Sequence, residues 1–284
     1  MNKHKLAETL RRLEVPHPHT VALQTEADLL AVHETDLARY FLKPCSSQAF
    51  SARYHVKAFR AGTREQALAR FHQVKRDGLE VVLQESIPGP PTNHYFIDGF
   101  VDRNRRICAR FARRRIRMYP PQFGNSSYMT TVPLAEVAEA VTAVERLVSG
   151  MNYRGIFSAE FKLDDRDRIF KLLELNVRPW WYIEFAALCG VDVCAMAYRD
   201  ALGEEVLPVD SYRVGVNCVH PGLDLTISLK QMFHGELTPG AAIGSWLHAQ
   251  QAVFHRDDPL PAIVGFAYHI REWIRDSYFL RRRS

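Results

Sequence analysis

Residues 160–179, EFKLDDRDRIFKLLELNVRP, contain the pattern that decides the fold. A charged segment at residues 164–168 separates two stretches in which apolar and polar side chains alternate. Alternation with a period of two is typical of strands, and a short polar segment between two such stretches predicts a tight turn. We therefore expect antiparallel strands at residues 155–163 and 169–176.

The two predicted strands bring oxygen ligands together on one face. Glu174, Asn176 and Arg178 alternate along the second strand, so they share a face, and Glu160 can lie beside Glu174 on the first strand. Two carboxylates and an amide oxygen form a hard-oxygen site that suits Mg²⁺, and a guanidinium two residues further on would meet a transferred phosphoryl group. The alternative is an exposed sheet face with ordinary ion pairs.

Lysine residues near the N-terminus form a second candidate site. Residues 41–44 and 54–59 predict a β-hairpin with a polar connection, which would carry Lys43 on one strand and Lys57 on the other. Together with Lys3 they offer three ammonium groups to a triphosphate. The alternative is that each lysine is solvated on the surface.

A strand followed by a hinge forms a third candidate site. Residues 79–84 predict a short apolar strand that ends at Gln84, and residues 86–92 form a hinge rich in Pro and Gly. Backbone groups at such a hinge can bind the edge of an adenine, and Ile87 can supply an apolar wall. The alternative is an ordinary exit from a strand into a loop.

The rest of the chain predicts further helices and strands. Helical spacing and capping residues predict helices at residues 3–14, 25–41, 63–76, 133–150, 223–233 and 262–275. Further strands are expected at residues 21–23, 94–101 and 106–118. Strands that pair mostly with sequence neighbours indicate an α+β fold of two lobes that close on a ligand. The Arg-rich end at residues 281–283 is expected to be a solvated tail.

Composition excludes several classes of protein. The five cysteines are scattered without Cys-x-x-Cys pairs, which argues against a disulfide framework and a structural zinc site. Apolar runs are too short for a membrane span, and no secretory signal is present, so we expect a cytoplasmic protein without membrane contact. The net charge of +5 accompanies no recognisable nucleic-acid-binding module, so no nucleic acid is expected as a partner.

Taken in order, the motifs resemble those of the ATP-grasp superfamily. The resemblance runs from Asn2 to about Gly190 and rests on Asn2-Lys3, Val15-Pro-x-Pro-x-Thr20, Leu42-Lys43-Pro44, Val56-Lys57, Leu83-Gln84-Glu85-x-Ile87-x-Gly89, Glu160-Phe-Lys-x-Asp164 and Leu173-Glu174-Leu-Asn176-x-Arg178-Pro179. Further motifs resemble the branch that holds D-aspartate ligases and predicted ATP-dependent carboligases, namely RMYPPQFG at 117–124, CGVD at 189–192 and DDPLP at 257–261.

The resemblance implies an α+β ATP-grasp fold with two lobes and largely antiparallel sheets that sandwich the nucleotide. Residues 1–90 would form the N-terminal helix and the small lobe with a lid hairpin and a hinge at 84–92. Residues 91–206 would form the large lobe with the metal site, and residues 207–284 would form a C-terminal extension packed on the core. By the same resemblance, the chain lacks the N-terminal domain that precedes this core in most relatives.

The resemblance also implies a role for each site residue. Phosphates would be bound by Lys3, Lys43 and Lys57, and adenine by Gln84, Glu85 and Ile87. Two Mg²⁺ ions, with Mn²⁺ as the alternative, would be bound by Glu160, Glu174 and Asn176. Arg178 would steady an acyl phosphate, and Arg115 and Arg117 would reach phosphate from their strand, whereas His94 and His220 are expected to be structural.

The expected activity is that of an ATP- and Mg²⁺-dependent ligase. It would join a small carboxylate to an amine, such as an amino acid or a peptide, through an acyl phosphate and would release ADP. The alternatives are an ATP-grasp kinase or carboxylase with another acceptor, or a non-catalytic ATP-binding subunit. A separate protein that supplies the missing N-terminal domain, or a second copy in a homodimer, would be the protein partner.

Overall fold

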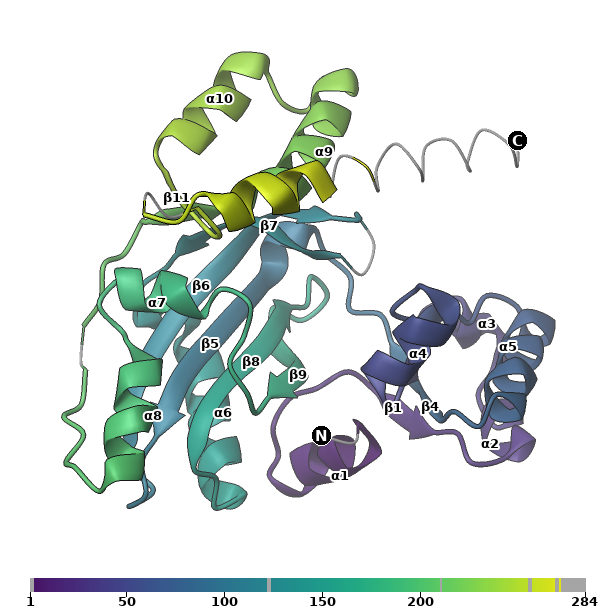
Figure 1. The fold of residues 1–284 in the computed structure, drawn as a ribbon. Helices are drawn as coiled ribbons and strands as arrows, with labels where there is room; N and C mark the ends of the chain where they lie inside the picture. Colours follow the sequence, from purple (N-terminus) through teal and green to yellow (C-terminus); the bar gives the residue numbers. More distant parts are fainter. Residues whose placement is uncertain (1–2, 122–123, 210, 255–256, 269–270, 272–284) are drawn as a thin grey trace. The chain divides into compact units, whose positions relative to one another are not determined.

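The computed structural model describes residues 3–121, 124–209, 211–254, 257–268 and 271, and Figure 1 traces its helices and strands. Contacts divide the chain into two compact units, and each is discontinuous in sequence. The first unit comprises Met1–Gly89, Ala138–Tyr153 and Ala159–Val177; the second comprises Pro90–Val137, Arg154–Ser158 and Arg178–Ser284. The division into domains at residues 90 and 206 stays a prediction.

The first unit contains a four-stranded antiparallel sheet of order β1-β4-β2-β3. Its strands are β1 (Thr20–Ala22), β2 (Tyr40–Pro44), β3 (Phe59–Arg60) and β4 (Val81–Glu85). Its helices are α1 (Lys3–Arg12), α2 (Glu26–Leu30), α3 (Glu34–Leu37), α4 (Ser47–Tyr54) and α5 (Arg64–Arg76). The register pairs Lys43 with Val82 and Phe41 with Gln84, which fixes both candidate residues on neighbouring strands.

Two local predictions for this unit are wrong and one is confirmed. The strand expected at residues 54–59 is shortened to β3, which begins only at Phe59. The chain after Ser46 instead forms α4 and buries Phe50 completely, with the Tyr54 and Phe59 rings 4.7 and 5.0 Å from its ring. The single helix expected at residues 25–41 is two short helices, since the backbone is extended at His33. The capping box of Thr63 and Gln66 opens α5 as predicted.

The first unit also contains α6 (Ala138–Gly150), β9 (Phe170–Asn176) and the second half of β8 (Gly155–Leu163). β8 and β9 match the two strands expected around the charged turn. Phe161 is fully buried between half-buried Glu160 and Lys162, so alternation along β8 separates an apolar face from a polar one. The polar face carries the candidate metal ligands.

The second unit is built on most of a seven-stranded sheet of order β11-β10-β7-β6-β5-β8-β9. Its own strands are β5 (His94–Val101), β6 (Ile107–Tyr119), β7 (Asn125–Thr131), β10 (Asn217–Val219) and β11 (Ala249–Gln251). β5 and β6 pair antiparallel as expected, β7 also pairs antiparallel with β6, and β10 pairs parallel with β11. The register of β6 against β7 shifts on both sides of Arg117, which marks a bulge at that residue.

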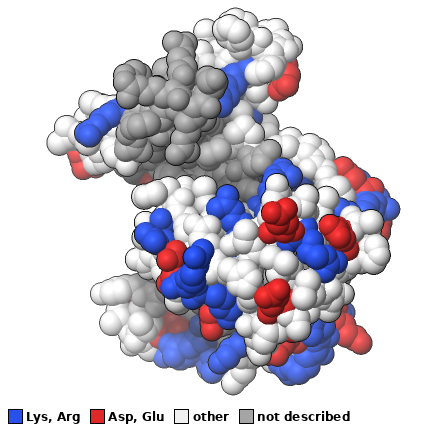
Figure 2. All heavy atoms as spheres, turned by 90° about the vertical axis from the view of Figure 1, so that its right-hand side faces the viewer, with Lys and Arg blue, Asp and Glu red and all other residues white. Residues whose placement is uncertain are grey.

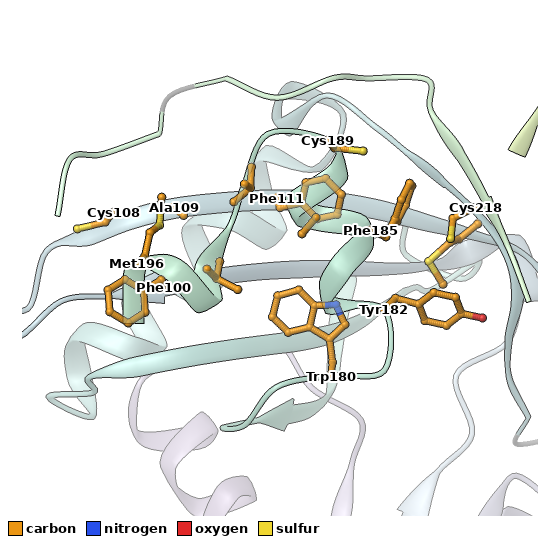
Figure 3. Close-up of a cluster of buried hydrophobic side chains, with 14 of the residues drawn as sticks. Phe100, Cys108, Ala109, Phe111, Trp180, Tyr182, Phe185, Cys189, Met196 and Cys218 are labelled. Carbon is orange, nitrogen blue, oxygen red and sulfur yellow. The ribbon is translucent and has the colours of Figure 1, made fainter. Parts of the chain in front are cut away.

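The helices of the second unit are η1 (Pro91–Asn93), η2 (Leu134–Val137), α7 (Ile183–Leu188), α8 (Val193–Leu202), α9 (Pro221–Phe233) and α10 (Pro239–Leu247). Of these, α7 and α8 contribute side chains to an apolar core (Figures 1 and 3). In Figure 3, Phe100 and Met196 lie at one end of the core and Tyr182 and Cys218 at the other, with Phe111 and Trp180 between them. This core joins β5 and β6 to α7 and α8.

Sequence analysis did not predict β7, because its sequence, NSSYMTT, is polar although most of its residues are buried. The structure satisfies these polar groups within the unit. The Ser126 hydroxyl accepts a hydrogen bond from Arg115, the Ser127 hydroxyl donates to Asp224, and the Thr131 hydroxyl donates to the Arg213 carbonyl. A polar strand can therefore be buried because each hydroxyl has a partner.

The C-terminal part is only partly described. The helix expected at residues 223–233 is α9, and residues 260–268 are helical, whereas most of the remaining helix expected to 275 and the basic residues 281–283 lie outside the described residues. Across the described chain, no helix combines the length and apolarity that a membrane crossing requires. On the face in Figure 2, Lys and Arg side chains are interspersed with Asp and Glu side chains.

Gly99 in β5 lets the Ala109 carbonyl and the Phe157 ring approach the β5 backbone closely within the second unit. A Cβ atom at this position would lie 2.3 Å from the Ala109 carbonyl oxygen and 2.6 Å from Cζ of Phe157. We expect Gly99→Ala to lower the free energy of unfolding by about 1–3 kcal/mol, because overpacking displaces the backbone or a fully buried ring. Urea denaturation should measure this loss, and Gly240→Ala, which has no atom within 4 Å of the added carbon, should leave stability nearly unchanged.

Candidate functional site

Lys43 lies at the centre of the candidate site in the first unit. Its Nζ donates to Oε1 of Gln84 at 3.0 Å and to the Leu173 carbonyl at 3.1 Å, so it joins β2 to both β4 and β9. Nε2 of Gln84 donates to the Thr20 hydroxyl at 3.1 Å, which turns the amide oxygen towards Lys43. Sequence analysis had marked Gln84 for adenine, and the structure gives it this contact with a lysine.

Charges of both signs gather around Lys43. Burial lowers the pKa of the Lys43 ammonium below its ordinary value, and the neighbouring Lys3 lowers it further, whereas Glu174 and Glu160 oppose the shift. Lys3 is itself nearly buried, with its Nζ 3.6 Å from Oε1 of Glu174 and 3.1 Å from the Ser47 hydroxyl. The structure thus brings Lys3, Lys43, Glu160 and Glu174 close together, while their binding roles stay predictions.

Asn176 ends β9 on the same strand face as Glu174, and both side chains are half-buried. The described part of the chain holds no group of three or more His, Cys, Asp or Glu side chains arranged for a metal ion. The expected set differs from such a group because it has two carboxylates and one amide. Its oxygen donors fit Mg²⁺ by type, and the metal site stays a prediction.

Lys57 is placed differently from expectation. It lies in an exposed bend between α4 and β3, so the prediction that it sits on a hairpin strand is wrong. β2 and β3 do pair antiparallel, yet the connection between them contains the helix α4. Both the lid function of this connection and the phosphate contact of Lys57 stay predictions.

The end of β4 is tied to the turn between β8 and β9. The backbone N–H of Glu85 donates to the His19 carbonyl at 2.9 Å, and the Glu85 carboxylate forms an ion pair with Arg166. Arg166 also pairs with fully buried Asp164, and its hydrogen bonds hold the pKa of that carboxyl below the ordinary range. Since the Glu85 N–H is engaged, adenine would need other backbone groups of the segment.

Lys162 is a residue of this region that sequence analysis did not select. Its Nζ donates to the Ile87 carbonyl at 2.8 Å, two residues after the end of β4. The period-two pattern of β8 could have revealed it, because Lys162 follows Glu160 by two residues and therefore shares its face. Ile87 itself is buried, as expected of an apolar wall.

The candidate arginines belong to the second unit. Arg117 is buried and donates to both carboxylate oxygens of Asp224 at 2.6–3.2 Å. Fully buried Asp224 also accepts from the Ser127 hydroxyl at 2.7 Å and from Nε1 of Trp246 at 2.8 Å. Arg117 therefore already has a carboxylate partner, Asp224 of α9. No sequence signal links Asp224 to β6.

Arg115 and Arg178 differ in exposure. Arg115 is buried, donates to the Ser126 hydroxyl at 2.9 Å, and lies over the Phe96 ring at 5.3 Å. Arg178 is exposed, and its Nη1 donates to the Pro179 carbonyl at 3.0 Å. The catalytic roles of these arginines stay predictions.

Known proteins that are similar to this chain include two ligases and a carboxylase domain. A D-aspartate ligase from Enterococcus faecium (strain Aus0004) is 24% identical over 210 residues, which cover 70% of this chain and 49% of that protein. A similar structure is the biotin carboxylase domain of Hydrogenobacter thermophilus 2-oxoglutarate carboxylase, in complex with MgADP, ADP and bicarbonate. It matches with a TM-score of 0.61 and 14% identity, and the match covers 76% of this chain and 48% of that chain. No family model matches.

A third similar protein is an L-amino acid ligase from Bacillus licheniformis, with a TM-score of 0.52, 17% identity and coverage of 73% of this chain and 51% of that chain. The chain thus spans about half the length of these proteins. The chain has the α+β fold of these structures, the ATP-grasp fold, so the prediction of the fold is confirmed. Within that class it is similar to the D-aspartate ligase.

The buried pair of Arg117 and Asp224 gives a test of the second unit. We expect Asp224→Ala to lower the free energy of unfolding by about 3–5 kcal/mol, because it leaves the Arg117 guanidinium buried without its counter-charge. The double variant Arg117→Met with Asp224→Leu should regain much of this loss, since it removes both charges. Urea denaturation of the three proteins measures the effect, and an unchanged midpoint in Asp224→Ala would show that the pair is not buried as described.

Proposed function

We propose that this chain is the ATP- and Mg²⁺-binding part of a carboxylate–amine ligase that works through an acyl phosphate. The observation that carries the proposal is the gathering of Lys3 and Lys43 with Glu160 and Glu174 within the first unit. Cations and carboxylates on one sheet face match the two components of MgATP, because ammonium groups bind phosphates and carboxylates bind the metal. The names of the similar D-aspartate ligase and L-amino acid ligase support an amine acceptor.

The lysines and carboxylates would exchange partners when the nucleotide binds. Lys3 now lies 3.6 Å from Glu174, and Lys43 is close enough to Glu174 for its charge to shift the lysine pKa. On binding, both ammonium groups would turn to the phosphates, while Glu160, Glu174 and Asn176 would hold Mg²⁺. The metal would supply neutralisation of the phosphate charge.

The reaction would proceed in two displacements. A carboxylate oxygen of the substrate attacks the γ-phosphorus of ATP, a new oxygen–phosphorus bond forms, and ADP leaves. The amine nitrogen then attacks the acyl carbon, phosphate leaves, and the nitrogen loses a proton to give the amide. Exposed Arg178, two residues beyond Asn176, would stabilise charge on the transferred phosphoryl group.

A second candidate is a carboxylase, and it is favoured by the similar biotin carboxylase domain, whose structure contains bicarbonate. Bicarbonate would then take the place of the carboxylate in the first displacement. In either case, the proposed protein partner is a separate protein or a second copy of this chain that contributes to the acceptor site.

The metal assignment is tested by ligand-induced stabilisation. We expect MgATP at a hundredfold excess over its dissociation constant to stabilise the protein by about 2.7 kcal/mol, and Glu174→Ala to remove most of this gain. Thermal unfolding with ATP alone and with MgATP measures both. Asp165→Ala changes an exposed carboxylate of the β8–β9 turn and should keep the full gain. Equal stabilisation of Glu174→Ala and wild type would remove Glu174 from the metal site.

The reaction type is tested by the nucleotide product. Chromatography after incubation with MgATP and a panel of carboxylates, amino acids and peptides should find ADP and phosphate, as expected for an acyl phosphate. Arg178→Ala should lower turnover roughly a hundredfold, because one well-placed donor to developing charge contributes about 3 kcal/mol to the transition state. AMP and pyrophosphate as products would overturn the acyl-phosphate mechanism, and a carbamate or carboxylated product formed from bicarbonate would favour the carboxylase.

A further inference from the structure

Exposed apolar side chains gather on two helices of the second unit. Phe233 is 95% exposed at the end of α9, and exposed Leu229 precedes it by four residues, so both lie on one helix face. On α10, Ile243 and Leu247 are 62% and 76% exposed at the same spacing. Each helix therefore presents an apolar stripe to solvent.

The other faces of these helices are held by buried polar contacts. Asp224 on α9 accepts from Nε1 of Trp246 on α10 at 2.8 Å, so the two helices are in contact, at one end of the second unit (Figure 1). With about 100° of rotation per residue, Phe233 lies roughly half a turn around α9 from Asp224. Ser245 accepts from an arginine of β6 at 3.0 Å, and Leu247 lies about 160° around α10 from Ser245. Both stripes thus face away from the contacts that hold the helices.

The helix at residues 260–268 adds a third stripe. Leu260, Ile263 and Val264 are between 59% and 63% exposed and lie at spacings of three and four residues. A stable interface buries about 800 Å² per partner, and at about 200 Å² for a large aromatic side chain Phe233 alone would supply roughly a quarter of that area. The six smaller side chains of the three stripes supply much of the remainder, so the area suffices for a stable contact.

The stripes of α9 and α10 belong to a part of the chain with few charges. From residue 225 to residue 254 the charged residues are Lys230 and Glu236, whereas charged residues make up 24% of the whole chain. Their signs are opposite, so this segment has no net charge, although the chain carries +5. A twofold-symmetric contact brings a surface against its own copy, where a net charge would repel itself. A surface without net charge is therefore suited to self-association.

The same composition argues against a lipid surface as the occupant. Helices that lie on a membrane carry Lys and Arg along the polar face, where these cations attract anionic headgroups. α9 and α10 together contain one lysine and no arginine. Apolar surfaces with few charges are instead typical of homodimer interfaces, which are more apolar than the rest of a protein surface.

We propose that the apolar stripes of α9, α10 and residues 260–268 form the docking surface for a second copy of this chain. Each copy would bury Phe233 and Leu247 against the stripes of the other copy in a twofold-symmetric contact. Association would be driven by the removal of apolar surface from water. The inference names the surface at which the second copy considered under the proposed function would bind, and the contact requires no nucleotide.

Sedimentation velocity of the full chain over a range of concentrations tests the contact. Wild type should dimerise at micromolar concentration, and Phe233→Glu and Leu247→Glu should each raise the dimer dissociation constant by about thirtyfold or more, as expected for loss of a buried anchor residue. Because both side chains are exposed in a single copy, circular dichroism should find the helix content of the variants unchanged.

Two further variants complete the design. Leu202 is 59% exposed and is the last residue of α8, as Leu247 is the last residue of α10, so Leu202→Glu is a matched control that should leave the dimer dissociation constant unchanged. Phe233→Leu keeps an apolar side chain and should weaken the dimer much less than Phe233→Glu does.

Two results would overturn the inference. In the first, wild type stays monomeric at every concentration, and co-sedimentation of that monomer with phosphatidylserine vesicles would assign the stripes to a lipid surface instead. In the second, Phe233→Glu and Leu247→Glu dimerise as tightly as wild type, which would place the contact on another face. Failure of the proposed function would look different, because the dimer would still form while MgATP would not stabilise the protein.

Discussion

The desolvated ammonium group of Lys43 is the constraint on which the candidate site depends. A cation removed from water must be compensated by nearby oxygen atoms, and the Gln84 amide, the Leu173 carbonyl and the charges of Glu160 and Glu174 provide this compensation. Because these groups come from β4, β8 and β9, holding Lys43 also fixes the strands that carry the expected metal ligands. Burial lowers the pKa of the Lys43 ammonium, and the neighbouring carboxylates of Glu174 and Glu160 oppose that shift.

In the second unit, the buried cations that need compensation are arginines. Arg113 and Arg117 are buried on β6 and pair with buried Asp98 and Asp224, and Arg115 between them donates to Ser126. Each guanidinium needs a partner from another element, so the cations fix β5, β7 and α9 against β6. Burial raises the pKa of Asp98, although the paired guanidinium of Arg113 opposes that shift. These arginines therefore contribute to the architecture whichever substrate the protein uses.

Sequence analysis succeeded where side-chain alternation and turn chemistry are local. β5, β8 and β9 begin and end within a residue of expectation, and one face of β8 and β9 carries Glu160 and Glu174 as alternation requires. It failed where burial depends on distant partners. α4 buries Phe50 in a core that it shares with Leu29 and Val81. β7 is buried because Ser126 and Ser127 find partners in other elements. Contacts between such distant residues leave no periodic signal in the sequence.

The positions of Lys162 and Arg166 show how a short turn can organise a binding segment. The β8–β9 turn places Arg166 on the Glu85 carboxylate, and the strand before it places Lys162 on the Ile87 carbonyl, so both bind the segment that follows β4. A segment that binds a base by its backbone must keep a fixed conformation, since each hydrogen bond depends on the direction of a carbonyl or an N–H group. Side chains from the hairpin that carries the expected metal ligands therefore hold the segment after β4, which is expected to bind a base, in a fixed conformation.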